Sequence, residues 1–197
     1  MIYFHTAINH FVMRTITSFT FLTINGYYKG LNEDISWHIH GGEGTKMSED
    51  QLEADNILLF GRRTYEMMAG FWPSDMAYQL YPEVAAGMNR AEKIVLSNSL
   101  QSAAWSPTTI LSGNTIEQIR NLKSIPGKNI TILGSGSVVR QLSDAGLIDQ
   151  YEFLLDPVAI GQGTPLFQDL EQHLHLKLKD CQVFKESGSV FLTYQKV

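Results

Sequence analysis

The hydrophobic positions of the chain fall into short apolar runs, separated by stretches in which apolar residues recur every three or four positions. The short runs are rich in β-branched and aromatic residues, a pattern that predicts buried strands. They occupy residues 15–24, 56–60, 93–96, 108–111, 130–133 and 150–155. The stretches between them predict helices at residues 48–54 (with Ser48 as N-cap), from 61 to the break at Phe71-Trp72-Pro73, at 76–88, at 115–122 and from 137 onward.

Two further β-type stretches, 174–184 and 189–197, are joined by residues 185–188 and predict a hairpin. Strands that alternate with helices and end in a hairpin predict an α/β fold with a mostly parallel central sheet and an antiparallel C-terminal edge. The sequence contains no internal repeat and no linker, so residues 13–197 are predicted to form a single domain. We expect residues 1–12 to be an N-terminal extension upstream of the functional start; an extra edge strand is the alternative.

Composition and charge narrow the class of protein and its partners. Hydrophobic residues make up 44% of the 197 residues and charged residues 18%, as in globular proteins. The net charge of −5 argues against a nucleic-acid-binding or anionic-membrane surface, and no apolar run reaches the ~18 residues of a membrane span. The single cysteine, Cys181, excludes an internal disulfide and fits a reducing, cytoplasmic compartment. Because Cys181 lies in a predicted strand, we expect it to be packed rather than reactive.

Four small residues, Gly134-Ser135-Gly136-Ser137, separate the apolar run 130–133 from the start of a predicted helix. Glycine has no Cβ, so such a turn lets an anion approach the backbone. The N–H groups and the positive dipole end of the helix then face that anion. The turn therefore predicts the phosphate-binding part of a nucleotide site. Val139 stands where a complete dinucleotide-binding fingerprint has its third glycine, and an ordinary strand–helix turn is the alternative interpretation.

Two other predicted strands end in polar residues of a similar kind. These residues are Gly61, Arg62, Arg63 and Thr64 after the second strand, and Ser97 and Asn98 after the third. If the strands are parallel, all three ends lie on one edge of the sheet, where α/β folds bind ligands. Guanidinium groups, hydroxyls and amides suit a ligand with several separated phosphates. An arginine and serine cluster without a ribose-binding carboxylate favours NADP over NAD, with a solvated helix face as the alternative for the arginines.

The segment from residue 26 to residue 46 is glycine-rich and longer than a structural connection needs, which favours a functional loop. We expect it to close as a lid over the reacting groups, with Trp37 at its hinge. Aromatic residues in loops suit the walls of a site for a flat heterocycle, with core packing as the alternative. The candidate substrate-binding residues are Asn25, Tyr28, Trp37 and Trp72. Glu43 is the candidate proton donor, provided that burial raises its pKa.

Two histidine pairs, His38-x-His40 and His173-x-His175, could each place two imidazoles on one strand face. No third ligand follows at convincing spacing, so we interpret them as surface histidines and predict no metal site. The sequence also contains no recognisable nucleophile motif.

With these segments placed, the chain resembles the dihydrofolate-reductase-like superfamily. Within it, the chain is most similar to the reductase domain that forms the C-terminal half of the bifunctional riboflavin-biosynthesis deaminase/reductase, and to the stand-alone bacterial relatives of that domain. The resemblance runs from about residue 14 to residue 197 and rests on the order and spacing of five stretches. They read FLTINGYYKG, LLFGRRTYEMM, KIVLSNSL, ITILGSGSVVRQL and GLIDQYEFLLDPVAIGQGTPLF. Asn25 stands where the family usually has aspartate, and the zinc motif of the deaminase is absent from the sequence.

The resemblance implies a three-layer fold with helices on both faces of the sheet, a homodimer, and NADPH bound across residues 61–64, Ser97 and the Gly-Ser-Gly turn. We therefore expect a cytoplasmic, NADPH-dependent reductase of a small heterocyclic or carbonyl substrate, with no nucleic-acid or membrane partner. A non-catalytic nucleotide-binding or scaffold module on the same fold is the alternative function, and a structural dimer without a ligand is a third.

Overall fold

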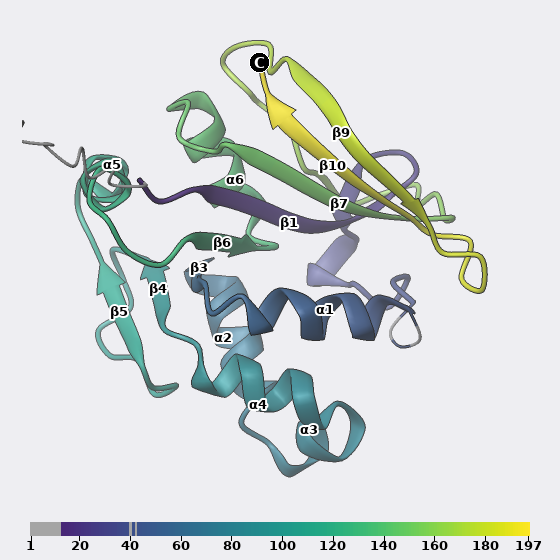
Figure 1. Cartoon of the computed structure of the whole chain (residues 1–197), viewed down its shortest axis with the longest axis horizontal. Coiled ribbons are helices and arrows are strands. Elements are labelled where there is room, and N and C mark those ends of the chain that lie inside the picture. Colours follow the sequence, from purple (N-terminus) through teal and green to yellow (C-terminus); the bar gives the residue numbers. More distant parts are fainter. Residues whose placement is uncertain (1–12, 40, 42) are drawn as a thin grey trace, which may run out of the picture.

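The computed structural model describes residues 13–39, 41 and 43–197, which build a three-layer fold around an eight-stranded sheet (Figure 1). The sheet strands are β1 (Ile16–Thr23), β3 (Ile57–Gly61), β4 (Lys93–Leu96), β5 (Thr108–Leu111), β6 (Ile130–Leu133), β7 (Gln150–Asp156), β9 (Leu176–Val183) and β10 (Val190–Lys196). The helices are α1 (Glu43–Glu53), α2 (Arg62–Phe71), α3 (Asp75–Leu80), α4 (Pro82–Arg90), α5 (Thr115–Lys123), α6 (Gly136–Asp144) and the 3-10 helix η1 (Leu31–Glu33). Two short strands, β2 (Tyr27–Lys29) and β8 (Thr164–Pro165), pair separately.

The sheet is mostly parallel, with an antiparallel C-terminal hairpin, as the sequence predicts. Its strand order is β5-β4-β3-β6-β1-β7-β10-β9. Strands β5 to β7 in this order run parallel, whereas β10 is antiparallel to both β7 and β9. After β1, the chain adds β3, β4 and β5 on one side of it. It then returns to place β6 between β1 and β3, and it adds β7 on the other side of β1, so the strand order reverses at this point. Open α/β sheets bind ligands at the carboxyl ends of the strands beside such a reversal.

Helices cover both faces of the sheet because successive side chains of each buried strand point to opposite faces. Leu59 and Ile132 face α5 and α6, which contribute Ile119, Val139 and Leu142 to the larger core. Leu58 and Phe60 face the other side, where α2 and α4 contribute Tyr65, Val84 and Met88. Figure 1 shows α1 to α4 on one side of the sheet and α5 and α6 on the other.

The segment 26–46 is less irregular than the sequence suggests. It contains β2 and η1, and α1 begins at Glu43 rather than near Ser48. Ser48 is therefore not an N-cap; its hydroxyl donates to the carbonyl of Gly44 (3.0 Å) inside the helix. Near its C-terminal end α1 packs closely on α4, where a Cβ on Gly87 would lie 2.9 Å from Cβ of Leu52. Tertiary packing of this kind overrides the low helix propensity of glycine.

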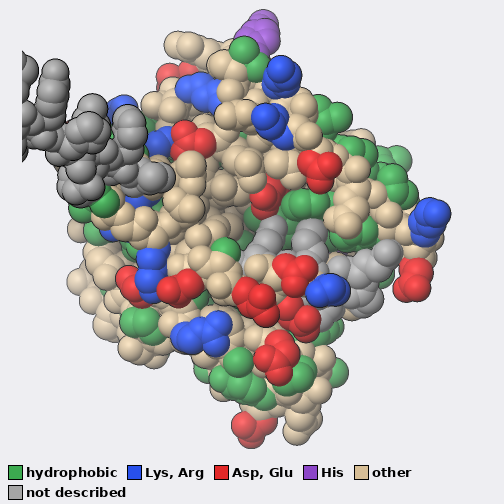
Figure 2. Space-filling model, in the orientation of Figure 1, with side chains coloured by type: hydrophobic (Ala, Val, Ile, Leu, Met, Phe, Trp, Pro, Cys, Tyr) green, Lys and Arg blue, Asp and Glu red, His purple; other side chains and the backbone are tan. Residues whose placement is uncertain are grey.

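The predicted N-terminal extension, residues 1–12, lies outside the described residues. Cys181 corrects the expectation of a packed cysteine. It is exposed, because β9 forms the outer edge of the sheet and both of its faces are largely open to solvent. On the face drawn in Figure 2, lysine and arginine side chains are interspersed with acidic ones over the described surface and do not form one continuous basic patch.

Candidate functional site

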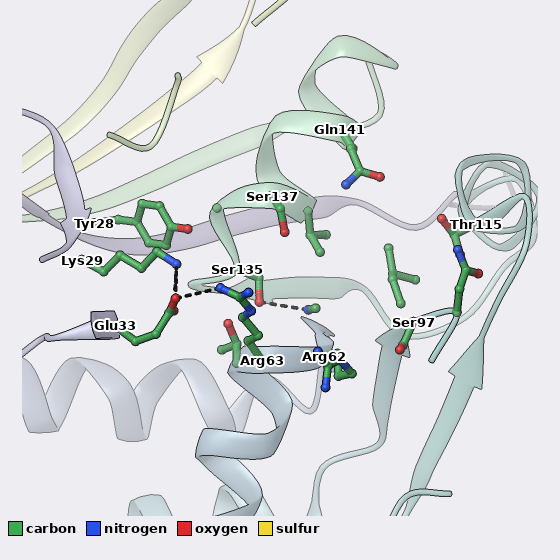
Figure 3. A pocket seen from close by; sticks show the side chains of 16 residues that line it. Tyr28, Lys29, Glu33, Arg62, Arg63, Ser97, Thr115, Ser135, Ser137 and Gln141 are labelled. Atoms are coloured by element: carbon green, nitrogen blue, oxygen red, sulfur yellow. Dashed lines mark hydrogen bonds and ion pairs between the residues drawn. The ribbon is translucent and has the colours of Figure 1, made fainter. Parts of the chain in front are cut away.

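The carboxyl ends of β3, β4 and β6 meet at one edge of the sheet and enclose a polar pocket of 320 Å³ (Figure 3). The structure brings together there most of the predicted cofactor residues, namely Gly61, Arg62, Arg63, Thr64, Ser97, Asn98, Ser135, Gly136 and Ser137. Gly134 lies beside them, in the wall of a neighbouring cavity. The role of these residues in binding stays a prediction, but their juxtaposition follows from parallel strands that end at the same level.

The turn 134–137 has a conformation that few residues adopt. Gly134 and Ser135 both have positive φ, +55° and +52°, a region that strongly favours glycine. Ser135 does not cap α6 with its side chain; its Oγ accepts the backbone N–H of Gly61 (3.0 Å) and so ties β3 to the turn. By their position, the N–H groups of Gly136 and Ser137 at the start of α6 have no intrahelical acceptor, whereas that of Val138 donates to the carbonyl of Ser135 (2.7 Å). Together with the helix dipole, the first two N–H groups suit an anion.

Gly136 allows Tyr28 to approach the turn. A Cβ at Gly136 would lie 2.5 Å from Cζ of Tyr28, which is closer than any real contact of that kind. The tyrosine ring therefore lies directly against the start of α6, as Figure 3 shows. Tyr28 lines both the polar pocket and the neighbouring cavity.

Basic side chains of the polar pocket pair with two glutamates. Arg62 donates to Glu66 one turn further along α2 (3.1 Å), and Arg63 donates to Glu33 of η1 (3.0 Å). Glu33 also accepts a hydrogen bond from Lys29 (2.7 Å), and Figure 3 shows both of its contacts. The bond from Lys29, together with the nearby Arg63 charge, lowers the pKa of Glu33. The pocket thus holds three cationic groups balanced by exposed carboxylates, which an anionic ligand could replace.

The polar side chains after β4 are partly committed to the local structure. Oγ of Ser97 accepts the backbone N–H groups of Ser99 (3.2 Å) and Leu100 (3.0 Å). Oδ1 of Asn98 accepts the N–H of Gly113 (2.7 Å). Their remaining donors, the Ser97 hydroxyl hydrogen and the Asn98 amide group, are the atoms that a ligand could engage.

A larger cavity of 750 Å³ adjoins the polar pocket. Its walls are mostly apolar: the sheet contributes Phe19, Phe21, Leu58, Leu133 and Leu154, the helices contribute Leu52, Met68, Phe71, Val84 and Met88, and Trp72 follows α2. The two spaces share Tyr28, Lys29, Glu33, Arg63, Thr64 and Ser135. A polar, cationic pocket therefore opens into an apolar one, an arrangement that suits a ligand with phosphates at one end and a flat ring at the other.

One wall of the larger cavity carries a histidine that is paired with a buried aspartate, a contact that the sequence does not indicate. His38 and Asp156 are 7% and 1% exposed, and Nδ1 of His38 lies 2.6 Å from Oδ2 of Asp156. The hydroxyl of Ser189 donates to Oδ1 of the same carboxylate (2.8 Å). The imidazole stacks on Phe21 with the ring centroids 3.6 Å apart. The interpretation of His38 as a surface histidine is therefore wrong, because the pair and the stacking bury it.

Two of the predicted substrate-binding residues, Tyr28 and Trp72, line the larger cavity, whereas Asn25 and Trp37 are absent from the described linings of both spaces. The Asn25 side chain donates to the carbonyl of Ile160 (2.8 Å) and thereby fixes the end of β1. Trp37 packs edge to face against His38. Glu43, the predicted proton donor, begins α1 rather than lying in a loop, and its side chain is outside what the structure describes.

Sequence reasoning missed several residues of the two spaces: Lys29, Glu33, Thr115 and Gln141 in the polar pocket, and His38 in the larger cavity. The signal for Thr115 was present, because it follows β5, which ends at the same edge as β3, β4 and β6. The same reasoning would have indicated Asp156, because it is the last residue of β7. No local pattern singles out Lys29, Glu33 or His38.

We also searched the described residues for metal sites and membrane-spanning helices, and located the remaining histidines of the two pairs. The described residues contain no group of three or more His, Cys, Asp or Glu side chains that could hold a metal ion. His173 and His175 are exposed, and His40 lies outside the described residues. None of the helices in the described part of the chain has the length and apolar character needed to cross a membrane.

Comparison with known proteins identifies related sequences and folds. The family model of the RibD C-terminal domain matches residues 14–188. The uncharacterized protein YyaP of Bacillus subtilis (strain 168) is 26% identical over 186 residues, which cover 94% of this chain and 97% of that protein.

Among solved structures, a diaminohydroxyphosphoribosylaminopyrimidine deaminase/5-amino-6-(5-phosphoribosylamino)uracil reductase of Thermotoga maritima matches with a TM-score of 0.68 and 14% identity, over 94% of this chain and 57% of that one. A dihydrofolate reductase of Enterococcus faecalis, complexed with NADP(H) and RAB-propyl, matches with a TM-score of 0.55 and 14% identity, over 94% of this chain and 99% of that one. The fold is therefore that of dihydrofolate reductase, as the resemblance implies.

Proposed function

The chain belongs to the RibD C-terminal domain family, and from this premise we propose that it is an NADPH-dependent reductase of a small heterocyclic or carbonyl substrate. The observation that carries the proposal is the polar pocket at the strand ends, which opens directly into the large apolar cavity. A reductase of this kind needs both spaces, one for the phosphates of a dinucleotide and one in which its nicotinamide meets the substrate.

The residues of the polar pocket fit the cofactor. The first turn of α6 would hold the pyrophosphate through backbone N–H groups, since Gly136 leaves no Cβ in the way. Arg62 and Arg63 offer guanidinium groups that pair well with phosphate, and their present partners, Glu66 and Glu33, are half-exposed. When bound, NADPH supplies a hydride; the protein positions the reacting groups and excludes water.

The substrate would occupy the larger cavity, next to Tyr28 and Trp72. The aromatic walls suit a flat ring. Two of the solved relatives, a 5-amino-6-(5-phosphoribosylamino)uracil reductase and a dihydrofolate reductase, point to pyrimidine- or pteridine-like rings. We therefore favour a ring of this kind over an aliphatic carbonyl compound. We also expect a homodimer in the cytoplasm, for which light scattering that returns twice the 22.2 kDa mass of one chain is the first check.

Thermal unfolding with NADPH, NADH and buffer tests the proposal. A ligand that binds only the folded state must stabilise it, by about 2.7 kcal/mol at 100 times its Kd. We expect a clear rise in Tm with NADPH, a smaller one with NADH, and oxidation of NADPH in the presence of a pyrimidine or pteridine from a substrate panel. No rise in Tm with millimolar NADPH would contradict the proposal.

A non-catalytic nucleotide-binding module is the second candidate. One observation favours it: the carboxylates among the described residues that line the larger cavity, Glu33 and Glu66, are both paired with basic side chains. This candidate predicts that NADPH binds and raises Tm but is not oxidised with any compound of the panel.

A further inference from the structure

The larger cavity contains a group suited to move a proton. Resting on the proposed function, we propose that His38, oriented by Asp156, contacts the heterocycle in the larger cavity and gives a proton to its ring nitrogen during reduction. Asp156 and Ser189 act through His38 and are positioning residues.

The geometry fixes the orientation of the imidazole. Nδ1 of His38 lies 2.6 Å from Oδ2 of Asp156, and the ring is parallel to Phe21 within 14°. These two contacts set both the direction of the ring and its plane. His38 also lines the larger cavity. Because Nδ1 faces Asp156, Nε2 is the ring atom that would exchange a proton with a ligand.

An imidazolium at this place would supply the positive charge that a buried carboxylate needs. Oδ1 of Asp156 accepts a hydrogen bond from the Ser189 hydroxyl, and Oδ2 lies 2.6 Å from Nδ1 of His38. Asp156 is 1% exposed, and an ionised carboxylate at such a site needs a positive partner. Within the described part of the chain, His38 is the group within ion-pair distance of Asp156.

The carboxylates among the described residues that line this cavity are engaged elsewhere. Glu33 pairs with Lys29 and Arg63 at the opening shared with the polar pocket, and Glu66 pairs with Arg62 on α2. Each of these pairs is partly exposed, whereas the pair of His38 and Asp156 is buried against the sheet. Low exposure strengthens a hydrogen bond from an imidazolium to a ring nitrogen.

The step balances as follows. The carbon of a ring C=N bond accepts the hydride that the reduced nicotinamide supplies, and the π electron pair of that bond moves to the nitrogen. His38 gives the nitrogen the proton from Nε2, so that an N–H bond forms as the Nε2–H bond breaks. The products are the reduced ring, oxidised nicotinamide and a neutral imidazole, which takes a proton from water before the next turnover.

A binding experiment tests the contact without turnover. Pterin, a fluorescent flat heterocycle, is titrated into the protein saturated with NADP⁺. We expect His38→Gln, which can still hydrogen-bond to Asp156, to weaken pterin binding about tenfold or more, because a hydrogen bond from a charged donor is lost. The affinity for NADP⁺ should stay within about twofold. The matched control, His175→Gln, removes an exposed imidazole and should change neither affinity.

Three results of this titration would overturn the proposal: wild-type protein that does not bind pterin, His38→Gln that binds it as tightly as wild type, and His38→Gln that loses pterin and NADP⁺ together. The last result would assign His38 a structural role only.

Chemical rescue tests the proton transfer. His38→Ala should lower kcat about 10²- to 10⁴-fold, the usual range for general acid catalysis, in NADPH oxidation with dihydropterin. Added imidazole should restore at least a tenth of the lost rate. Pyrazole has the same shape but is too weak a base to carry a proton near neutral pH, and it should restore none. Equal rescue by both compounds, or full activity of His38→Ala, would overturn the proposal. Glu43→Gln in the same assay tests the other candidate donor.

Failure of the proposed function is distinguishable from failure of this inference. If wild-type protein does not bind NADPH, the proposed function fails, and pterin titration without cofactor still decides whether His38 makes the contact. If NADPH and pterin both bind but no hydride is transferred, the proposed reduction is refuted. The effect of His38→Gln on pterin affinity then still decides whether His38 contacts the heterocycle.

Discussion

Arg62 and Arg63 are neighbours in sequence with different partners, because successive helical residues point about 100° apart. Both line the polar pocket, and both pair with a glutamate at a partly exposed site. Exposed pairs of this kind contribute little to stability, so a phosphate that competes for the guanidinium groups has little to displace. We infer that the two arginines are available to the cofactor.

Arg63→Ala should weaken the binding of NADPH about ten- to a hundredfold, since a charge-assisted contact to phosphate is worth roughly 1.5–3 kcal/mol. NADH should be affected less if the arginine contacts the 2′-phosphate, and the same holds for Arg62→Ala. Fluorescence titration with both cofactors measures this, with Arg120→Ala on the exposed surface of α5 as the control. Equal loss of affinity for NADPH and NADH would indicate that the arginine contacts the pyrophosphate and not the 2′-phosphate. No effect on the affinity for either cofactor would indicate that the arginine belongs to a solvated helix face and does not bind the cofactor.

Lys93 carries a second prediction at this scale. It is 2% exposed, its Nζ donates to the carbonyl of Ala91 (2.6 Å), and it lies 4.4 Å from the centroid of the Trp105 ring. Burial lowers the pKa of Lys93 to about 8, whereas an unfolded chain has a lysine pKa of about 10.4. Between these two values the unfolded chain binds more protons than the folded one, so the free energy of unfolding rises with pH.

We therefore expect wild-type protein to gain about 2 kcal/mol relative to Lys93→Met between pH 7 and pH 9.5. Below pH 8 the lysine is charged in both states and its burial penalty is present in full. Chemical denaturation of both proteins at the two pH values measures the difference. Parallel pH dependence of the two unfolding free energies would show that Lys93 titrates in the folded state as it does in the unfolded one.

Single residues also show the limit of what the sequence reveals about the site. Residues 61–64 and 134–137 could be placed together because each follows an apolar strand, and strand direction brings them to one edge. His38 and Asp156 are 118 residues apart; their contact depends on how the segment after β2 folds back over the sheet, which no local pattern specifies. Asn25 lies in the turn that the sequence predicts, but its side chain donates a hydrogen bond to the carbonyl of Ile160.

At the scale of elements, the start of α6 and the strand β2 depend on each other through Gly136 and Tyr28. Gly136→Ala should displace the Tyr28 ring, because its Cβ would lie 2.5 Å from Cζ of that ring. Overpacking of this kind typically costs about 1–3 kcal/mol. Since Tyr28 lines both the polar pocket and the larger cavity, NADPH affinity should fall as well.

Gly70→Ala is the matched control for this substitution. Gly70 lies inside α2, where a Cβ would have nothing within 4 Å, so alanine should stabilise the protein by about 0.5–1 kcal/mol. Denaturation curves and NADPH titration of both variants provide the measurements. A Gly136→Ala protein that binds NADPH as tightly as wild type would refute the close fit between Tyr28 and α6.

The segment after β1 is the second element to test. The sequence predicts a lid, and in the structure residues 27–39 are held by the pairing of β2 with β8, by Glu33 with Arg63, and by His38 with Asp156. We expect hydrogen exchange in residues 27–39 to slow when NADPH and pterin are both bound, because closure protects the backbone. The β9–β10 hairpin is the internal reference. If the exchange rates in residues 27–39 do not change on binding, this segment is not a lid.

At the scale of the whole molecule, most of the fold could be predicted. Buried parallel strands are nearly continuous apolar runs, so β1, β3, β4, β6 and β7 stand out in the sequence, and their connection through helices fixes a parallel sheet. The start of α1 was not predicted, because the glycines before Ser48 mask a helix that packing on α4 stabilises. The exposure of Cys181 depends on β9 being the outermost strand, which is a property of the completed sheet.

The central claim is that NADPH lies across the carboxyl ends of β3, β4 and β6 with its nicotinamide at the opening between the two spaces. A crystal structure with NADP⁺ bound tests this most directly. The account predicts phosphate oxygens within hydrogen-bond distance of the first turn of α6 and of Arg62 or Arg63, and the nicotinamide ring beside Tyr28, facing the larger cavity. A cofactor bound elsewhere, with the turn 134–137 and both arginines making no contact to it, would contradict the account.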